Sequence, residues 1–168
     1  MDFDDLIRTR YSCRSFSNKA VEEEKIKKVI EAGILAPTAR NFQPQKIKIL
    51  KSKDDLEKLS ECTKFGWNAP VCLVICYDKG ISYKRGIDNK EFGDIDSSII
   101  TTYMMLEIVD LDLATTWIGH FDSEKVKEVY NLPENYVPVA ILPIGYPAED
   151  AKPSERHFER KSLDEILF

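Results

Sequence analysis

The sequence contains no run of apolar residues near the length of about 20 that a helix needs to cross a bilayer. Its first ten residues, MDFDDLIRTR, carry three aspartates where a secretory signal would carry basic residues followed by an apolar stretch. We therefore expect a cytoplasmic protein that has no membrane partner.

Glycine is scarce, and its seven residues never form G-x-G-x-x-G or G-x-x-x-x-G-K-[ST]. Both the Rossmann dinucleotide signature and the P-loop are therefore missing. A basic surplus is lacking too, because 24 Lys and Arg stand against 29 Asp and Glu, which argues against nucleic acid as a partner. A phosphate group, if the protein binds one, must be held by side chains that gather locally.

The four cysteines and two histidines fit no metal or dithiol pattern. There is no C-x-x-C pair and no histidine cluster near a cysteine, so we expect free thiols and no metal site. Cys72 and Cys76 lie in the apolar run APVCLVICY, where small buried cysteines are ordinary. With so few histidines to act as activating bases, a catalytic cysteine is disfavoured.

The chain of 168 residues is of the usual length for one domain, and 43% of it is apolar. No repeat or linker divides it, so we expect a single domain over residues 1–168. Residues 94–113 are apolar around most of a helical circumference, which predicts a central helix that is buried on nearly all sides. Further helices are expected at 2–10, 21–37, 52–62 and 123–133, a capping box at Ser162, and strands at 45–50, 69–77, 114–119 and 136–147.

Three clusters could carry chemistry, and the first is basic. Arg10, Ser12 and Arg14 alternate, so an extended segment sends all three side chains to one side. Two guanidinium groups and a hydroxyl suit a phosphate monoester. The alternative is an ordinary solvated basic surface, which is the more common meaning of surface charge.

The second cluster is the loop APTARNFQPQ, stiffened by Pro37 and Pro44, in which the amides of Asn41 and Gln43 alternate with Phe42. Such amides suit the edge of a heterocycle, although they could equally satisfy the loop's own backbone. The third cluster is a pair of strands that each run into a glycine, which lets a backbone N–H approach a flat ligand, although such a glycine is more often only a turn. These glycines are Gly119 and Gly145.

Taken in order along nearly the whole chain, these motifs resemble those of the nitroreductase family of flavin-dependent enzymes. The family's opening R-R-S-x-R is matched by Arg10, Ser12 and Arg14, and its A-P-S-x-x-N-x-Q-P by residues 36–44. Its G-L-G-x-x-W-I-G segment, P-x-G-x-P strand end and R-K-x-L-x-E tail are matched by Leu113, Trp117, Ile118, Gly119, Pro143, Gly145, Pro147, Arg160, Lys161, Leu163 and Glu165.

The sequence departs from the family pattern at two places. Asp112 and Ala114 replace the two glycines of G-L-G, so the helix end needs another geometry, and aspartate tolerates a left-handed backbone better than most residues. Gln45 stands where an aromatic residue often follows Q-P, which bears on the substrate pocket.

The resemblance implies an α+β fold, a three-layer α/β/α arrangement with a mixed, mainly antiparallel sheet around a buried central helix. It also implies a homodimer with two FMN sites at its interface. The FMN phosphate would lie beside Arg10, Ser12, Arg14, Arg160 and Lys161. The ring and ribityl chain would lie beside Pro37, Thr38, Asn41 and Gln43 of the partner subunit and the backbone at Ile118, Gly119 and Gly145.

The implied activity is that of an oxidoreductase. NADH or NADPH would reduce FMN at N5, and a small-molecule acceptor such as a nitroaromatic or a quinone would then take the hydride. The flavin carries this chemistry, so no catalytic side chain is assigned. Two alternatives stay open: a protein that stores or senses FMN without fast turnover, and a specialised flavin-consuming or dehalogenating enzyme on the same fold.

Overall fold

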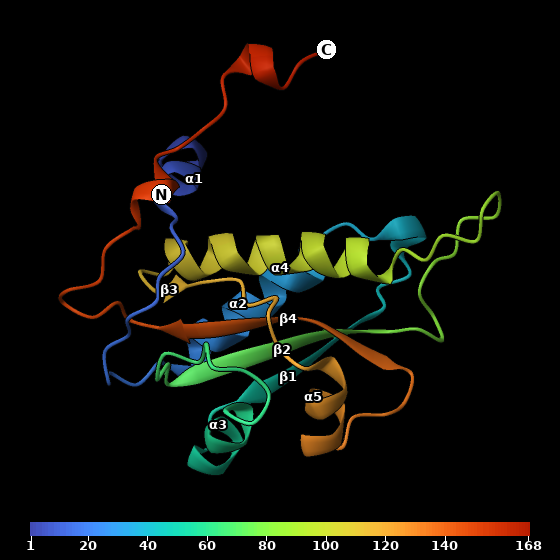
Figure 1. Ribbon diagram of the computed structural model, residues 1–168, viewed down its shortest axis with the longest axis horizontal. Helices are drawn as coiled ribbons and strands as arrows, with labels where there is room; N and C mark the ends of the chain where they lie inside the picture. Colours follow the sequence, from blue (N-terminus) through green and yellow to red (C-terminus); the bar gives the residue numbers. More distant parts are fainter.

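A computed structural model describes residues 1–168 as three layers, with helices on both faces of one four-stranded sheet (Figure 1). All neighbouring strands run antiparallel, and a single parallel bridge joins Ser12 to Thr115 at the edge. The strands, in their order across the sheet, are β1 (Gln45–Leu50), β2 (Val71–Asp78), β4 (Tyr136–Gly145) and β3 (Ala114–Thr115). The predicted α+β layers and the mainly antiparallel sheet are confirmed.

Two apolar cores separate the sheet from its helices. On one face, α2 (Glu23–Leu35) and α4 (Gly93–Asp110) pack on side chains such as Leu73 and Leu142. On the other face, α3 (Lys53–Leu59) and α5 (Ser123–Val129) cover Val74. Strand β2 is buried on both faces, which explains why its sequence reads as a continuous apolar run.

The predicted helix starts are confirmed by their caps. The side chains of Asp2, Ser52 and Asp122 accept hydrogen bonds from backbone N–H groups in the first turns of α1 (Phe3–Thr9), α3 and α5. Ser162 and Glu165 form the expected capping box, although only a single 3₁₀ turn follows it. Short polar signals therefore mark where these three helices begin, whereas α2 and α4 start without a side-chain cap.

Helix α4 differs from the prediction, because it is buried on its sheet side only. Its outward side chains Ile95 and Leu106 are half-buried, and Tyr103 is 43% exposed. The chain alone thus leaves an apolar stripe on α4 without a partner. None of the helices combines the length and hydropathy that crossing a bilayer requires.

The prolines of β4 lie inside the strand rather than at its margins. Pro143 stands opposite Thr116, where the ladder between β3 and β4 is interrupted, and the same register resumes at Ile118 and Ile141. The missing N–H of proline accounts for the gap. For this reason β3 is shorter than the expected strand over 114–119.

The C-terminal tail passes beside α1 and then leaves the body of the molecule (Figure 1). The rings of Tyr11 and His157 lie 6.5 Å apart, edge to face, where the tail crosses the N-terminal segment. Beyond that point the apolar side chains of Leu163, Leu167 and Phe168 are largely exposed. In the single chain, the end of the tail therefore has nothing to pack on.

Gly93 is expected to tolerate no side chain. A Cβ atom there would lie 2.3 Å from two ring carbons of Tyr77, so Gly93→Ala must displace a buried ring and should cost about 1–3 kcal/mol of unfolding free energy. Urea denaturation followed by circular dichroism measures the loss. Gly86→Ala is the matched control because nothing lies within 4 Å of its Cβ, and equal stability of the two variants would contradict the prediction.

Candidate functional site

The basic N-terminal segment has the extended form that its alternation predicts. Ser12 forms the bridge with Thr115, and the backbone N–H of Cys13 donates to the Thr115 carbonyl at 3.0 Å. Cys13 points into the core and is fully buried, whereas Arg14 on the alternate side is exposed. The segment thus joins the sheet edge through a single bridge, with Arg14 exposed and Arg10 half-buried.

The arginines of this segment are free to bind an anion. Neither Arg10 nor Arg14 forms an ion pair, although the chain has 29 acidic residues. The Nη1 atom of Arg14 donates only to the Ser12 carbonyl, at 3.3 Å. Unneutralised guanidinium groups beside a hydroxyl are the donor set that a phosphate monoester requires.

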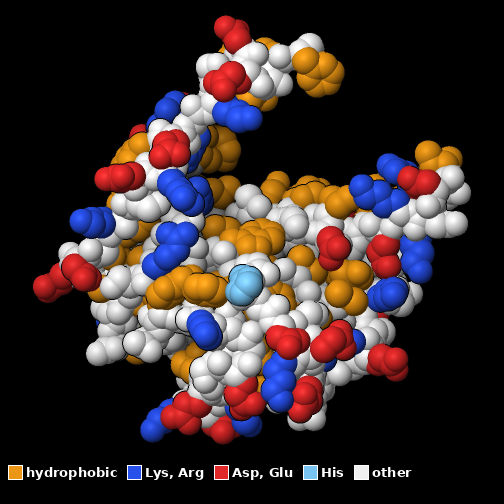
Figure 2. Space-filling view, viewed as in Figure 1, with side chains coloured by type: hydrophobic (Ala, Val, Ile, Leu, Met, Phe, Trp, Pro, Cys, Tyr) orange, Lys and Arg blue, Asp and Glu red, His pale blue; other side chains and the backbone are white.

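The tail brings further cations to the same side of the molecule. Figure 2 shows Lys and Arg side chains gathered along the N-terminal segment and the tail. Arg160 and Lys161 are both exposed, and the Nη1 atom of Arg160 donates to the carbonyl of Glu159 at 2.7 Å. The tail that carries these two residues crosses the N-terminal segment where the rings of Tyr11 and His157 lie 6.5 Å apart.

A hollow of about 600 Å³ lies between the loop after α3 and the loop between β3 and α5. We call it the Gly119 hollow. Its two walls are fastened together, because the Thr63 hydroxyl donates to the His120 carbonyl at 2.8 Å and the Asp122 N–H donates to the Cys62 carbonyl at 3.0 Å. It is lined by Ser60, Glu61, Cys62, Thr63, Lys64, Phe65, Gly119, His120, Phe121 and Asp122.

Three successive backbone donors line this hollow. The N–H groups of Gly119, His120 and Phe121 make no hydrogen bond within the chain. By contrast, the Ile118 backbone exchanges two hydrogen bonds with Ile141, at 3.0 and 3.1 Å, and its side chain is buried. Of the two residues predicted here, only Gly119 can offer a donor to a ligand.

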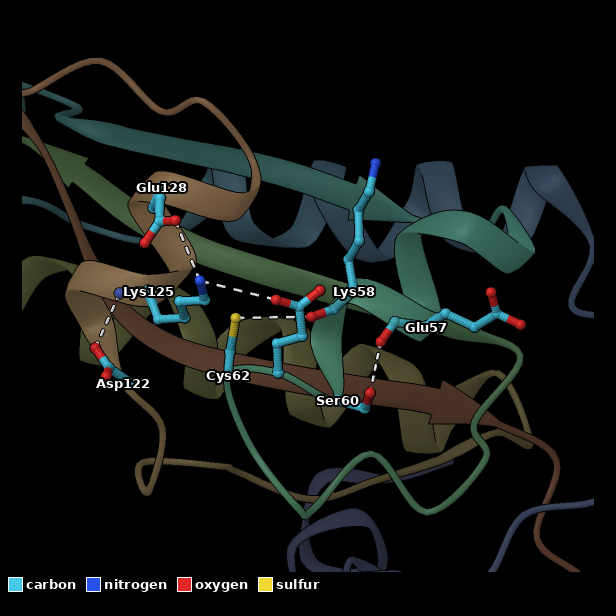
Figure 3. Close-up of polar contacts among 8 residues, drawn as sticks. Glu57, Lys58, Ser60, Cys62, Asp122, Lys125 and Glu128 are labelled. Carbon is cyan, nitrogen blue, oxygen red and sulfur yellow. Dashed lines mark hydrogen bonds and ion pairs between the residues drawn. The ribbon is translucent and has the colours of Figure 1, made fainter.

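Polar contacts connect α3 and the loop that follows it to α5, next to the hollow (Figure 3). The Lys125 ammonium lies 3.1 Å from Glu128 and 3.8 Å from Glu61, so it ties the two elements together. Burial raises the pKa of the Cys62 thiol, which donates weakly to the Lys58 carbonyl. Cys62 is thus a packed thiol and not an activated nucleophile.

The amide loop has a strained backbone. Arg40, Asn41 and Gln43 have φ values of 54°, 57° and 49°, in the left-handed region that residues other than glycine seldom adopt. The hydroxyl of Thr38 accepts from the Gln43 N–H at 3.1 Å, and the Gln43 amide donates to the Asn41 carbonyl at 3.4 Å. Part of the loop's hydrogen bonding is therefore internal, while the Asn41 amide makes no bond within the chain.

Asp96, which the sequence analysis did not single out, holds this loop. Its carboxylate is 1% exposed and accepts the Ala39 N–H at 2.9 Å, while its second oxygen has no partner. No signal in the sequence separates it from Asp94, Glu107 and Asp110 in the same helix, because only its burial in the fold distinguishes it. Pro37, which follows the end of α2, is exposed beside the loop.

The amide loop and the basic segment lie at opposite ends of α4 (Figure 1). Asp96, which binds the loop, is in the first turn of α4, whereas Asp110 at its last turn pairs with the N-terminus at 2.8 Å. An 18-residue helix is about 27 Å long, so one chain cannot bring both groups to one small ligand.

Gly145 and Asp112 are two further residues of the family motifs. Gly145 is buried, and a Cβ atom there would meet Pro70 at 2.8 Å and Phe16 at 3.1 Å, so packing alone requires glycine at this position. Asp112 has φ 59°, which confirms the left-handed backbone that its place in the motif predicts.

A second hollow of about 720 Å³ lies against α3, on the other side of Thr63 and Lys64. It is larger than the Gly119 hollow but contains none of the predicted site residues. The Gly119 hollow, which follows the bridge to Ser12 by four residues, is therefore the better candidate.

Comparisons with known proteins agree with this arrangement. A model of the nitroreductase family matches residues 7–64 and 61–146. Two archaeal proteins named for NADH dehydrogenase and NAD(P)H nitroreductase activity are similar: one from Methanothermobacter thermautotrophicus is 29% identical, covering 89% of this chain and 80% of the relative, and one from Archaeoglobus fulgidus is 30% identical, covering 86% and 85%.

Among solved structures, a nitroreductase family protein from Clostridium difficile superposes with a TM-score of 0.94. It is 37% identical, and the match covers 100% of this chain and 98% of that chain. The family match over most of the chain, together with this fold, shows that the chain belongs to the nitroreductase family.

Proposed function

We propose that the protein is an FMN-dependent oxidoreductase that passes a hydride from NADH or NADPH to a small-molecule acceptor such as a nitroaromatic or a quinone. Membership of the family and the names of its relatives support an NAD(P)H-dependent oxidoreductase. The observation that carries the proposal is that arginines without an ion pair and the Gly119 hollow belong to connected segments. The bridge between Ser12 and Thr115 connects these segments.

The residues present fit FMN. The phosphate, with a charge of about −1.5 to −2, would be held by Arg10, Ser12 and Arg14, with Arg160 and Lys161 reaching it from the tail. The free N–H groups that begin at Gly119 would donate to polar atoms on the edge of the ring. When bound, the flavin supplies hydride transfer, and donors fixed in advance favour the extra negative charge of its reduced form.

The functional unit would be a homodimer. The two halves of the site lie at opposite ends of α4, and a two-fold axis through its uncovered stripe would place each amide loop near the partner's basic segment. Pro37, Thr38, Asn41 and Gln43 of one subunit would then complete the site of the other. The exposed apolar end of the tail would gain a surface to cover.

The absorbance spectrum of the purified protein tests the cofactor, and anaerobic titration with NADH and with NADPH tests the reaction. We expect flavin absorbance bands whose intensity corresponds to about one FMN per chain. These bands should bleach with at least one nicotinamide and return when p-benzoquinone is added. A protein that binds no FMN contradicts the proposal outright. Flavin bands that neither nicotinamide bleaches would instead favour the storage or sensing role.

A further inference from the structure

His120 is the titratable side chain of the Gly119 hollow that has no structural task. The imidazole makes no hydrogen bond within the chain, and its one aromatic contact in the hollow is with Phe65, edge to face at 5.7 Å. The residue is exposed to solvent in the single chain. It can therefore both meet a ligand in the hollow and exchange protons with water.

The backbone that carries this imidazole is fixed on both sides. Ile118 is locked into the sheet by its two hydrogen bonds with Ile141, and the His120 carbonyl accepts from Thr63 at 2.8 Å. The N–H of Asp122 is held by the Cys62 carbonyl at 3.0 Å. The position of His120 is thus set by the fold, with only side-chain rotation left free.

We propose that His120 supplies the proton that reduction of the acceptor consumes, an assignment that rests on the proposed function. Reduction of p-benzoquinone to hydroquinone takes one hydride and one proton. The hydride would leave N5 of the reduced flavin, which is thereby oxidised, and add to one carbonyl oxygen of the quinone. The electron pair passes through the ring to the other oxygen, and a new O–H bond forms there as an imidazolium N–H bond breaks. Water then returns a proton to the neutral imidazole.

The other titratable groups around the hollow are less suited to this role. Asp122 caps α5, and Glu61 lies 3.8 Å from the Lys125 ammonium, so both carboxylates are already engaged. Burial raises the pKa of Cys62, which makes its thiol a poor acid. Lys64 forms no ion pair, but its ammonium group makes none of the contacts that place the His120 ring beside Phe65 in the hollow.

The test compares two acceptors in the FMN-loaded protein. Quinone reduction requires a proton, whereas ferricyanide takes electrons only. We expect His120→Gln to retain its FMN and its rate of bleaching by nicotinamide, to keep its ferricyanide turnover, and to lose about 100-fold in quinone turnover. The matched control is Glu124→Gln on the exposed part of α5, which should match the wild type with both acceptors.

Two further readouts separate proton donation from a structural role. Added imidazole should restore turnover to His120→Ala. In the imidazole NMR spectrum of the FMN-loaded protein, hydroquinone should shift the His120 resonance and leave that of His157 in place.

Wild-type quinone turnover in His120→Gln would overturn the assignment of the proton to His120, even with the flavin fully reducible. Failure of imidazole rescue in a folded, flavin-loaded His120→Ala would do the same. If the wild-type protein binds no FMN, the proposed function itself fails. The two failures are distinguished by the flavin absorbance alone.

Discussion

Replacing Arg10 and Arg14 together by alanine is expected to weaken FMN binding by about two to four orders of magnitude. A hydrogen bond to a charged group contributes about 1.5–3 kcal/mol, and each 1.4 kcal/mol is a factor of ten in affinity. Neither arginine has an intramolecular ion pair to lose, so the effect should fall on the ligand and not on the fold. Quenching of FMN fluorescence on titration with apoprotein measures the affinity.

Arg8→Ala is the matched control for this pair. Arg8 lies in the same stretch but inside α1, outside the alternation that puts Arg10 and Arg14 on one side. It removes one positive charge, where the pair removes two, and should change the affinity little. An Arg10→Ala/Arg14→Ala protein that is folded and binds FMN as tightly as the wild type would refute the phosphate site.

The second large effect is expected at the outer face of α4. A glutamate in place of Tyr103 would put an unpaired charge into the proposed apolar subunit interface, which typically costs 2 kcal/mol or more, or about 30-fold in the dimer dissociation constant. Sedimentation velocity at micromolar protein concentration should show the variant shifted toward monomer. The flavin should be lost with the dimer, because each site would draw on two chains.

Lys53→Glu provides the control for α4. It also makes the chain more negative, but it lies on α3 in the opposite helical layer, where its side chain is 90% exposed. A wild-type holoprotein that sediments as a monomer would rule out the dimer. Full flavin retention in a monomeric Tyr103→Glu protein would show that one chain suffices for binding.

Features encoded by neighbouring residues could be predicted from the sequence. The caps at Asp2, Ser52 and Asp122 are local hydrogen bonds, and the alternation around Ser12 follows from the geometry of an extended chain. The left-handed backbone at Asp112 was predictable for the same reason. Each of these depends on a few consecutive residues and on no distant contact.

Features that depend on distant contacts could not be predicted. An apolar helix has the same sequence pattern whether its outer face packs on the chain's own core or on a partner subunit. The uncovered apolar stripe of α4 was therefore not predicted. The need for glycine at Gly145 comes from Pro70 and Phe16, far away in sequence. The isolated imidazole of His120 became visible only once Thr63 and Phe65 were placed beside it.

The separation of the amide loop and the basic segment by the length of α4 has a thermodynamic consequence for the proposed dimer. If each flavin is held by two chains, flavin binding and subunit association are linked equilibria, and each must strengthen the other by the same factor. Dilution would then release cofactor without any chemical change to the site. An excess of FMN would in turn raise both the dimer fraction and the melting temperature, so the cell's flavin supply would set how much assembled enzyme exists.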